Sequence, residues 1–261
     1  MKTKNGLRIA LAQVDLVWEN PEQNRLNLER GIANLKSLCD LVILPETFTT
    51  GFSTSAYDLA EPMDGLTIKW LINLSATTQI AICGSLIIKD GDQVFNRFVF
   101  VQPNGQIVFY DKRHLFSIGG EAHPFKQGNK KLIVTYLGWR IALYICYDLR
   151  FPVWCRNVND TDLMIFTANW PASRSEVWNI LLKARAIENQ VVVAGVNRVG
   201  TDGNGIFYSG NSQVINMKGE NFVPFFSSEN GWLIYEVSLN ELQIFRKKFP
   251  VAKDADNFTI N

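Results

Sequence analysis

The feature that most constrains the fold of this chain is an alternation of short, continuously apolar runs with segments that repeat apolar residues at helical spacing. In the first half, apolar runs at 7–14 and 41–44 flank a helical pattern that begins with Asn20 as N-cap and Pro21 as first helical residue. That helix is expected to end near residue 37 or 38. The run at 41–44 contains no alternating polar residues, which is typical of a strand buried on both faces. The pattern therefore predicts a sheet covered by helices.

The same kinds of segment continue along the chain, with hairpins between them. Residues 94–101 and 106–110 are β-rich runs joined by Pro103, Asn104 and Gly105, a sequence typical of a hairpin turn. Further strands are expected at 80–88, 131–136, 139–145, 163–167, 191–196, 206–215, 223–226 and 232–237. Further helices are expected at about 66–77, 152–157, 177–189 and 239–245.

Strand and helix patterns occur in both halves of the chain. Two sheets, each with its own helix layer, fit this order better than one sheet, because every apolar sheet face and helix stripe then has a partner. We therefore predict an α/β fold arranged as a four-layer α-β-β-α sandwich. With 261 residues and no Pro/Ser-rich linker, the chain suits one large domain over residues 1–261.

The composition and net charge limit the classes of partner that can be expected for this chain. The apolar content of 47%, the charged content of 20% and the net charge of +1 are ordinary for a soluble enzyme. They provide no electrostatic reason to expect nucleic acid or an anionic membrane as a partner. The N-terminal apolar run is short and interrupted by polar residues, and no later run is long enough to span a membrane.

The four cysteines, Cys39, Cys83, Cys146 and Cys155, are widely spaced and form no CxxC pair. This spacing indicates neither a disulfide framework nor a zinc site. A reducing, cytoplasmic location is therefore expected.

Three residues that could carry chemistry end or follow apolar runs: Glu46 comes after LVIL, Lys112 after IVFY, and Cys146 after IALYI. Strand ends in a layered α/β fold can meet at one pocket. A carboxylate can accept the proton of a thiol, and an ammonium can stabilise both the thiolate and a later oxyanion. Taken singly, each residue also has a structural explanation: Glu46 as a cap, Lys112 as a surface charge, and Cys146 as a small core residue.

The combination is more specific than its parts. The blocks LPETFTTGF, YDKRHLF and CYDLRFP resemble, in order and spacing, the catalytic blocks of the nitrilase superfamily of carbon-nitrogen hydrolases, and the resemblance extends from RIALAQVD to GWLIYEVSL. It implies a nitrilase-type sandwich in which Glu46 is the general base, Lys112 stabilises the tetrahedral intermediate, and Cys146 forms a thioester and releases ammonia. Glu121 in GGEAHPF matches a second glutamate of the family, whose expected role is to position the lysine and the substrate.

Within that superfamily, KRHLFSIGGEAHPFKQG, CYDLRFP and TANWPASR are similar to the omega-amidases, which hydrolyse the terminal amide of ω-dicarboxylic acid monoamides such as 2-oxoglutaramate. The likeness implies that the backbone N–H of Tyr147 completes an oxyanion hole. Arg150 or Arg174 is expected to bind the far carboxylate of the substrate, although Arg150 could equally be a structural ion-pair partner. Phe116 and Trp170 are candidate apolar walls, with a core role as the alternative.

Other functions remain open at this point. A nitrilase or an N-carbamoyl amino acid amidohydrolase would use the same residues, and a glutamine-amidotransferase-like subunit would need a synthetase partner. A non-catalytic small-molecule-binding module would need none of Glu46, Lys112, Glu121 and Cys146 together.

The two histidines, His114 and His123, have no metal-binding spacing, and no GxGxxG or Walker sequence occurs, so neither a metal nor a cofactor is expected. The family commonly dimerises, which implies a homodimer. Residues 252–261 are mostly polar and could form an arm that docks on a partner.

Overall fold

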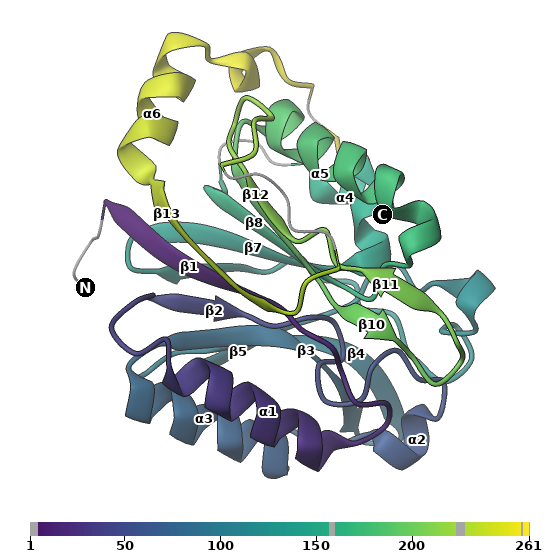
Figure 1. Cartoon of the computed structure of the whole chain (residues 1–261). Coiled ribbons are helices and arrows are strands. Elements are labelled where there is room, and N and C mark those ends of the chain that lie inside the picture. The colour runs from purple at the N-terminus through teal and green to yellow at the C-terminus, as the bar shows by residue number, and fades with distance from the viewer. Residues whose placement is uncertain (1–4, 157–159, 223–227, 257, 261) are drawn as a thin grey trace.

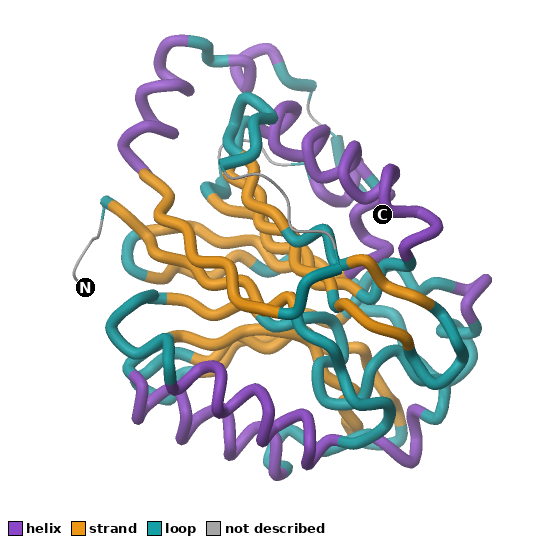
Figure 2. The backbone as a smooth tube through the Cα atoms, viewed as in Figure 1, coloured by secondary structure: helices purple, strands orange, loops and turns teal. Residues whose placement is uncertain are grey.

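The structure, a computed structural model, describes residues 5–156, 160–222, 228–256 and 258–260. Two β-sheets lie face to face in the middle of the molecule, and helices cover the outer side of each sheet (Figure 1). The tube view shows the strands gathered inside and the helices outside (Figure 2). The predicted four-layer α-β-β-α sandwich is therefore confirmed.

Among the described residues, the first sheet contains six strands in the order β13-β1-β2-β3-β4-β5. The three strands in the order β1-β2-β3 run parallel, whereas β13, β4 and β5 are each antiparallel to their neighbours. These strands are β1 (Gly6–Gln13), β2 (Leu41–Ile43), β3 (Ala81–Asp90), β4 (Gln93–Val101), β5 (Ile107–Asp111) and β13 (Gly231–Ser238).

The second sheet, within the same described ranges, has five strands in the order β12-β9-β8-β7-β6. Its three central strands run parallel and its two edge strands run antiparallel to them. These strands are β6 (Ile133–Tyr136), β7 (Trp139–Ile145), β8 (Leu163–Ala168), β9 (Val192–Asn197) and β12 (Gln213–Ile215). A separate two-stranded ribbon is formed by β10 (Val199–Thr201) and β11 (Phe207–Ser209).

Helices α1 (Pro21–Ala33) and α3 (Leu66–Thr78) cover the first sheet, and α5 (Ser175–Asn189) covers the second (Figure 1). As predicted, the Asn20 side chain caps α1 by accepting a hydrogen bond from the N–H of Gln23 at 3.0 Å. The other helical segments are α2 (Ala56–Leu59), α4 (Pro152–Cys155), α6 (Leu239–Lys248), η1 (Ser117–Gly119), η2 (Cys146–Arg150), η3 (Ala172–Arg174) and η4 (Val251–Asp254). No helix in the described part of the chain is long and apolar enough to cross a membrane.

Several expected elements differ in their bounds. The first helix ends at Ala33 rather than near residue 37 or 38, because the chain tightens into three-residue turns and Ser37 has a φ of 69°. The expected strand at 206–215 is split between β11 and β12, since Gly210 and Asn211 turn the chain with φ values of 71° and 66°. The helix expected at 152–157 ends at Cys155, because the backbone of Arg156 is extended with a ψ of 128°. Residue 157 and the strand expected at 223–226 lie outside the described residues.

The alternation of side chains along β1 shows how the layers are held together. Leu7, Ile9 and Leu11 face the second sheet and join the core between the sheets. Ala10 and Ala12 point the other way and pack with the apolar residues of α1 and α3. One strand therefore contributes to two hydrophobic cores, and all five side chains are fully buried.

Four strands of the two sheets deliver polar residues to the same region. Glu46 is separated from the end of β2 by two residues, whereas Lys112 follows β5 directly, Cys146 follows β7 directly, and Asn169 follows β8 directly. All four residues line one cavity. The sandwich thus positions residues from distant parts of the sequence around a single pocket.

Candidate active site

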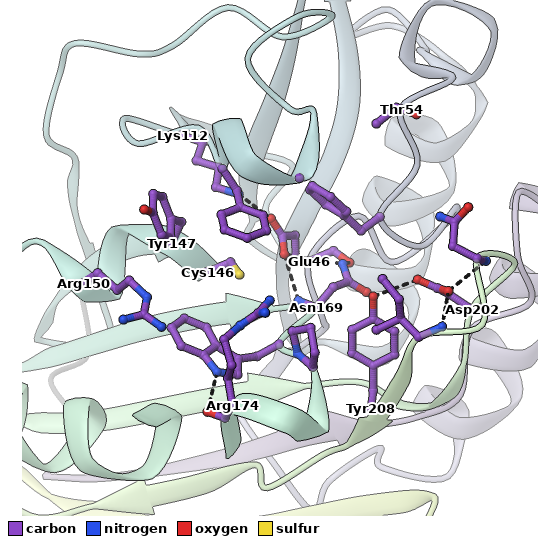
Figure 3. Close-up of a pocket in the computed structure, with 17 residues that line it drawn as sticks. Glu46, Thr54, Lys112, Cys146, Tyr147, Arg150, Asn169, Arg174, Asp202 and Tyr208 are labelled. Atoms are coloured by element: carbon purple, nitrogen blue, oxygen red, sulfur yellow. Dashed lines mark hydrogen bonds and ion pairs between the residues drawn. The ribbon is translucent and has the colours of Figure 1, made fainter. Parts of the chain in front are cut away.

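The pocket is a cavity of about 130 Å³, and Figure 3 shows the side chains that line it. Eight of the nine site residues expected from the sequence line this cavity. The ninth, Glu121, is fully buried and lies behind Lys112, to which it is hydrogen-bonded. The eight are Glu46, Lys112, Phe116, Cys146, Tyr147, Arg150, Trp170 and Arg174.

Glu46 is completely buried, and its carboxylate is held by hydrogen bonds from three other residues. Its Oε1 accepts from the Lys112 ammonium at 2.8 Å and from the side-chain amide of Asn96 at 2.8 Å. Its Oε2 accepts from the backbone N–H of Asn169 at 2.8 Å. These contacts come from both sheets and fix the direction in which the carboxylate points.

Lys112 lies between two carboxylates. Besides contacting Glu46, its Nζ donates to the two oxygens of Glu121 at 2.9 and 2.8 Å. Burial alone would lower the pKa of Lys112, but the charges of Glu121 and Glu46 outweigh burial and raise it above its ordinary value. Lys112 is therefore a permanent ammonium at neutral pH.

Glu121 is the second acid that binds Lys112, and it is fully buried. Burial raises the pKa of Glu121 above its ordinary value, the Lys112 ammonium opposes that rise, and the Glu46 charge adds to it. The backbone N–H of Phe116 also donates to Glu121 at 2.6 Å. Asn96 donates to Glu121 at 3.0 Å, so the same amide group binds both glutamates.

Cys146 is the first residue after β7 and has a φ of 42°, a conformation that non-glycine residues rarely adopt. Its thiol lines the same pocket as the Glu46 carboxylate. Burial raises the pKa of Cys146 well above the ordinary thiol value, and the Glu46 charge raises it further, whereas Lys112 lowers it. The resting group is therefore a neutral thiol with a carboxylate placed to accept its proton.

Asp148, which the sequence interpretation missed, holds the turn that follows Cys146. Its Oδ2 accepts from the backbone N–H of Ile145 at 3.0 Å and from the Tyr110 hydroxyl at 2.8 Å. Its Oδ1 accepts from the backbone N–H of His114 at 3.0 Å and lies 2.8 Å from the ring nitrogen of that residue. The turn that carries Cys146 is thereby joined to the loop that begins at Lys112.

His114 is bound to Asp148 and stacks on Phe151 with ring centroids 3.7 Å apart, so it belongs to this support. Within the described ranges, no group of three or more His, Cys, Asp or Glu side chains is arranged to hold a metal ion.

Two arginines line the pocket beside aromatic rings. The guanidinium carbon of Arg150 lies 5.2 Å from the ring centroid of Trp170, and that of Arg174 lies 5.5 Å from the ring centroid of Phe116. Neither arginine forms an ion pair with an acid in the described part of the chain. Both positive charges are therefore available to an anionic ligand.

Further residues of the site were not expected from the sequence. Asn96 interrupts the apolar run of β4 and is fully buried, and a buried polar residue in a strand is a signal that could have been noticed.

Asp202 lines the pocket and accepts hydrogen bonds from the Tyr208 hydroxyl at 2.8 Å and from the backbone N–H groups of Asn204 and Ile206. No local sequence pattern indicates that Asp202 and Tyr208 belong to the site, because their place at the pocket depends on how β10 and β11 pack beside it.

Comparison with known proteins supplies a context for this geometry. Residues 8–247 match the family model described as carbon-nitrogen hydrolase. The omega-amidase YafV of Escherichia coli K12 is 43% identical over 255 residues, which cover 98% of this chain and 99% of that protein. The 2-oxoglutaramate amidase of Bacillus subtilis is 30% identical over 251 residues, covering 94% of this chain and 96% of that protein.

Solved structures agree in fold. XC1258 of Xanthomonas campestris, a CN-hydrolase superfamily protein with an arsenic adduct in its active site, superposes with a TM-score of 0.96 at 42% identity, covering 99% of this chain and 100% of that one. Nit3 of Saccharomyces cerevisiae, a nitrilase superfamily member, superposes with a TM-score of 0.85 at 21% identity, covering 96% and 98%. At that identity the second likeness concerns the fold alone.

Proposed function

This chain belongs to the carbon-nitrogen hydrolase family of the nitrilase superfamily, and from that premise we propose that it is an omega-amidase. In this proposal it hydrolyses the terminal amide of short ω-dicarboxylic acid monoamides, such as 2-oxoglutaramate, to the acid and ammonia. The observation that carries the proposal is the meeting of a thiol, a carboxylate and an ammonium in one pocket, which is also lined by two arginines that form no ion pair with the described acids. The names of the similar omega-amidase and 2-oxoglutaramate amidase support the same substrate class.

The first half of the proposed reaction is acylation of Cys146. Glu46 takes the thiol proton as the sulfur attacks the amide carbon, and a tetrahedral oxyanion forms. The Lys112 ammonium stabilises this oxyanion together with the N–H of Tyr147, which lies in the first turn of η2, where helix N–H groups have no acceptor within the helix. Glu46 then donates the proton to the amide nitrogen, the C–N bond breaks, and ammonia leaves a thioester behind.

The second half is hydrolysis of the thioester. Glu46 takes a proton from water, the hydroxide oxygen attacks the thioester carbon, and Lys112 again stabilises the oxyanion. The C–S bond breaks, the acid leaves, and Glu46 returns its proton to the sulfur. Glu121 holds the ammonium of Lys112 in place through both steps, since it binds Nζ with both of its oxygens.

The other end of the pocket supports the choice of substrate. A cavity of about 130 Å³ holds roughly ten water-sized atoms, which is the size of a five-carbon oxo-acid amide. Arg150 and Arg174 can bind a carboxylate in the two-pronged manner typical of guanidinium groups. Phe116 and Trp170 form apolar walls suited to the methylene groups between the amide and the acid.

Two measurements test this proposal: a panel of substrates for the wild-type protein, and the activity of the Cys146→Ala variant. The wild-type protein is expected to release ammonia faster from 2-oxoglutaramate and succinamate than from glutamine, a nitrile or an N-carbamoyl amino acid, as measured by kcat/KM. Cys146→Ala should lose at least about 10³-fold in kcat because no thioester can form. Cys83→Ala, which removes a buried cysteine of β3, is the matched control and should keep its activity. Turnover confined to the nitrile or the carbamoyl compound would replace the amidase assignment.

We further propose that residues 1–261 form a single domain that acts in the cytoplasm as a homodimer. The family resemblance supports the dimer. Cys39, Cys83 and Cys155 are buried free thiols, which supports a reducing compartment. Sedimentation equilibrium tests the assembly, and a mass equal to one chain would contradict the dimer.

A further inference from the structure

The segment that leaves β8 contacts both ends of the pocket through two adjacent residues. The backbone N–H of Asn169 donates to Glu46 Oε2 at 2.8 Å, and its side-chain amide donates to the Glu46 carbonyl oxygen at 2.8 Å. The next residue, Trp170, contacts the two arginines at the opposite end. The proton acceptor and the cationic end of the site are thus held by one short piece of chain.

Trp170 contacts each arginine with a different part of its side chain. The indole N–H donates a hydrogen bond of 2.8 Å to the backbone carbonyl oxygen of Arg174, as a dashed line in Figure 3 shows. The face of the same indole lies 5.2 Å from the guanidinium carbon of Arg150, within the range of a cation–π interaction. Trp170 therefore anchors the backbone of Arg174 and offers its ring face to the exposed side chain of Arg150.

Trp170 is itself held firmly from behind. Its backbone N–H donates to Asn197 Oδ1 at 2.8 Å, and the Asn197 amide donates back to the Trp170 carbonyl oxygen at 2.9 Å. Its ring packs against Trp178 with centroids 5.5 Å apart, and only 3% of the residue is exposed. A side chain that is held by hydrogen bonds and packing can orient the residues that it contacts.

We propose that Trp170 is a positioning residue that sets the chain length of the acids this pocket accepts. This inference rests on the omega-amidase function proposed above. The reacting carbonyl must lie at Cys146 and Glu46, and the far carboxylate must reach both arginines. Because Asn169 and Trp170 fix those two ends relative to each other, only one spacing between amide and carboxylate satisfies both.

The length of the spacer should matter strongly. Adding or removing one methylene shifts the carboxylate by more than a bidentate arginine contact tolerates. One methylene is worth roughly 10- to 200-fold in the specificity of a fitted pocket. The wild-type protein should therefore prefer one chain length by at least about tenfold over its neighbours.

The experiment measures kcat/KM for a series of monoamides with one to four methylenes between amide and carboxylate, with butanamide as the uncharged reference. In Trp170→Phe the hydrogen bond to Arg174 is lost, so we expect the preference between neighbouring lengths to fall to about threefold or less. Trp70→Phe is the matched control, because it also removes an indole N–H, here bonded to Glu29, and Trp70 lies in α3 and does not line the pocket. It should keep the wild-type length profile.

A second variant separates the hydrogen bond from the shape of the ring. Replacing Trp170 with benzothienylalanine keeps the ring but removes the N–H donor, so the fold is preserved while the Arg174 contact is lost. It should broaden the length profile as Trp170→Phe does. An unchanged profile in both Trp170 variants, or equal broadening in Trp70→Phe, would overturn the inference.

The same series distinguishes the two proposals. If the kcat/KM of the wild-type protein for butanamide equals its kcat/KM for every carboxylate-bearing amide, the omega-amidase function itself fails. If the wild-type protein prefers carboxylate-bearing amides without preferring one chain length, only the role of Trp170 fails.

Discussion

At the scale of single residues, the site is a set of charges arranged around a neutral thiol. Two glutamates and one lysine are buried beside Cys146, which is itself partly exposed in the pocket. The pKa of the thiol stands above its ordinary value because of burial of the sulfur and the Glu46 charge. Many reactive cysteines instead have a lowered pKa. Here the thiolate is expected to form only as Glu46 takes the proton during attack.

This arrangement makes a prediction about pH. Because the raised pKa of Cys146 keeps the thiol protonated at neutral pH, its alkylation by iodoacetamide should accelerate about tenfold per pH unit between roughly pH 6 and 8, without a plateau. The rate is followed by mass spectrometry, with Cys146→Ala reporting background labelling of the other cysteines. A plateau reached below neutral pH would show a preformed thiolate and contradict the prediction.

At the scale of elements, the decisive piece is the short helix η2, which starts at Cys146. It holds the nucleophile in a left-handed conformation that costs about 1–3 kcal/mol in an unsupported chain. Asp148 supplies the support by binding Ile145, Tyr110 and His114. The loop that begins at Lys112 is fastened by the same carboxylate, so one residue aligns two elements.

Replacing Asp148 by Asn is the test at this scale. The amide keeps the shape but offers one acceptor oxygen in place of two, so hydrogen bonds to the turn or to the loop are lost. We expect the free energy of unfolding to fall by about 2–3 kcal/mol and kcat to fall at least about tenfold. Denaturant unfolding and steady-state kinetics measure both. Asp58→Asn, an exposed acid of α2, is the control, and equal effects at both positions would contradict the positioning role.

At the scale of the whole molecule, the pocket depends on the contact between the two sheets. The first sheet supplies Glu46 and Lys112, and the second supplies Cys146 and Asn169. The apolar layer between the sheets, which includes Leu7, Ile9 and Leu11 of β1 and residues of the second sheet, keeps these groups in register. The stability of the core and the geometry of the site are therefore linked.

Ile165 of β8 offers a test of this link, because its side chain is fully buried in the layer between the sheets. Ile165→Ala should lower the free energy of unfolding by about 2–5 kcal/mol through lost burial and a residual cavity. Ile118, which is 89% exposed, provides the control, and Ile118→Ala should change stability by less than about 0.5 kcal/mol. Chemical denaturation measures both values, and similar losses would disprove the assignment of the core.

Local patterns were enough for most elements, because the forces that define them act over a few residues. The cap at Asn20 and the turn at Gly105, with a φ of 82°, follow from the chemistry of those residues alone. The runs of apolar residues likewise predicted the two sheets and their helix layers. The three blocks around Glu46, Lys112 and Cys146 sufficed to identify the family, because their order and spacing are read along the chain.

What the sequence by itself determined is thus the periodicity, the turns and the identity of the reacting groups. Only the tertiary structure decided which groups support them: Asn169 meets Glu46 across 123 positions, and Asp148 meets Tyr110 across 38. It also decided that residues 206–215 divide between two sheets. Such contacts depend on how separate strands pack in space, and no local spacing encodes a hydrogen bond between residues that only packing brings together.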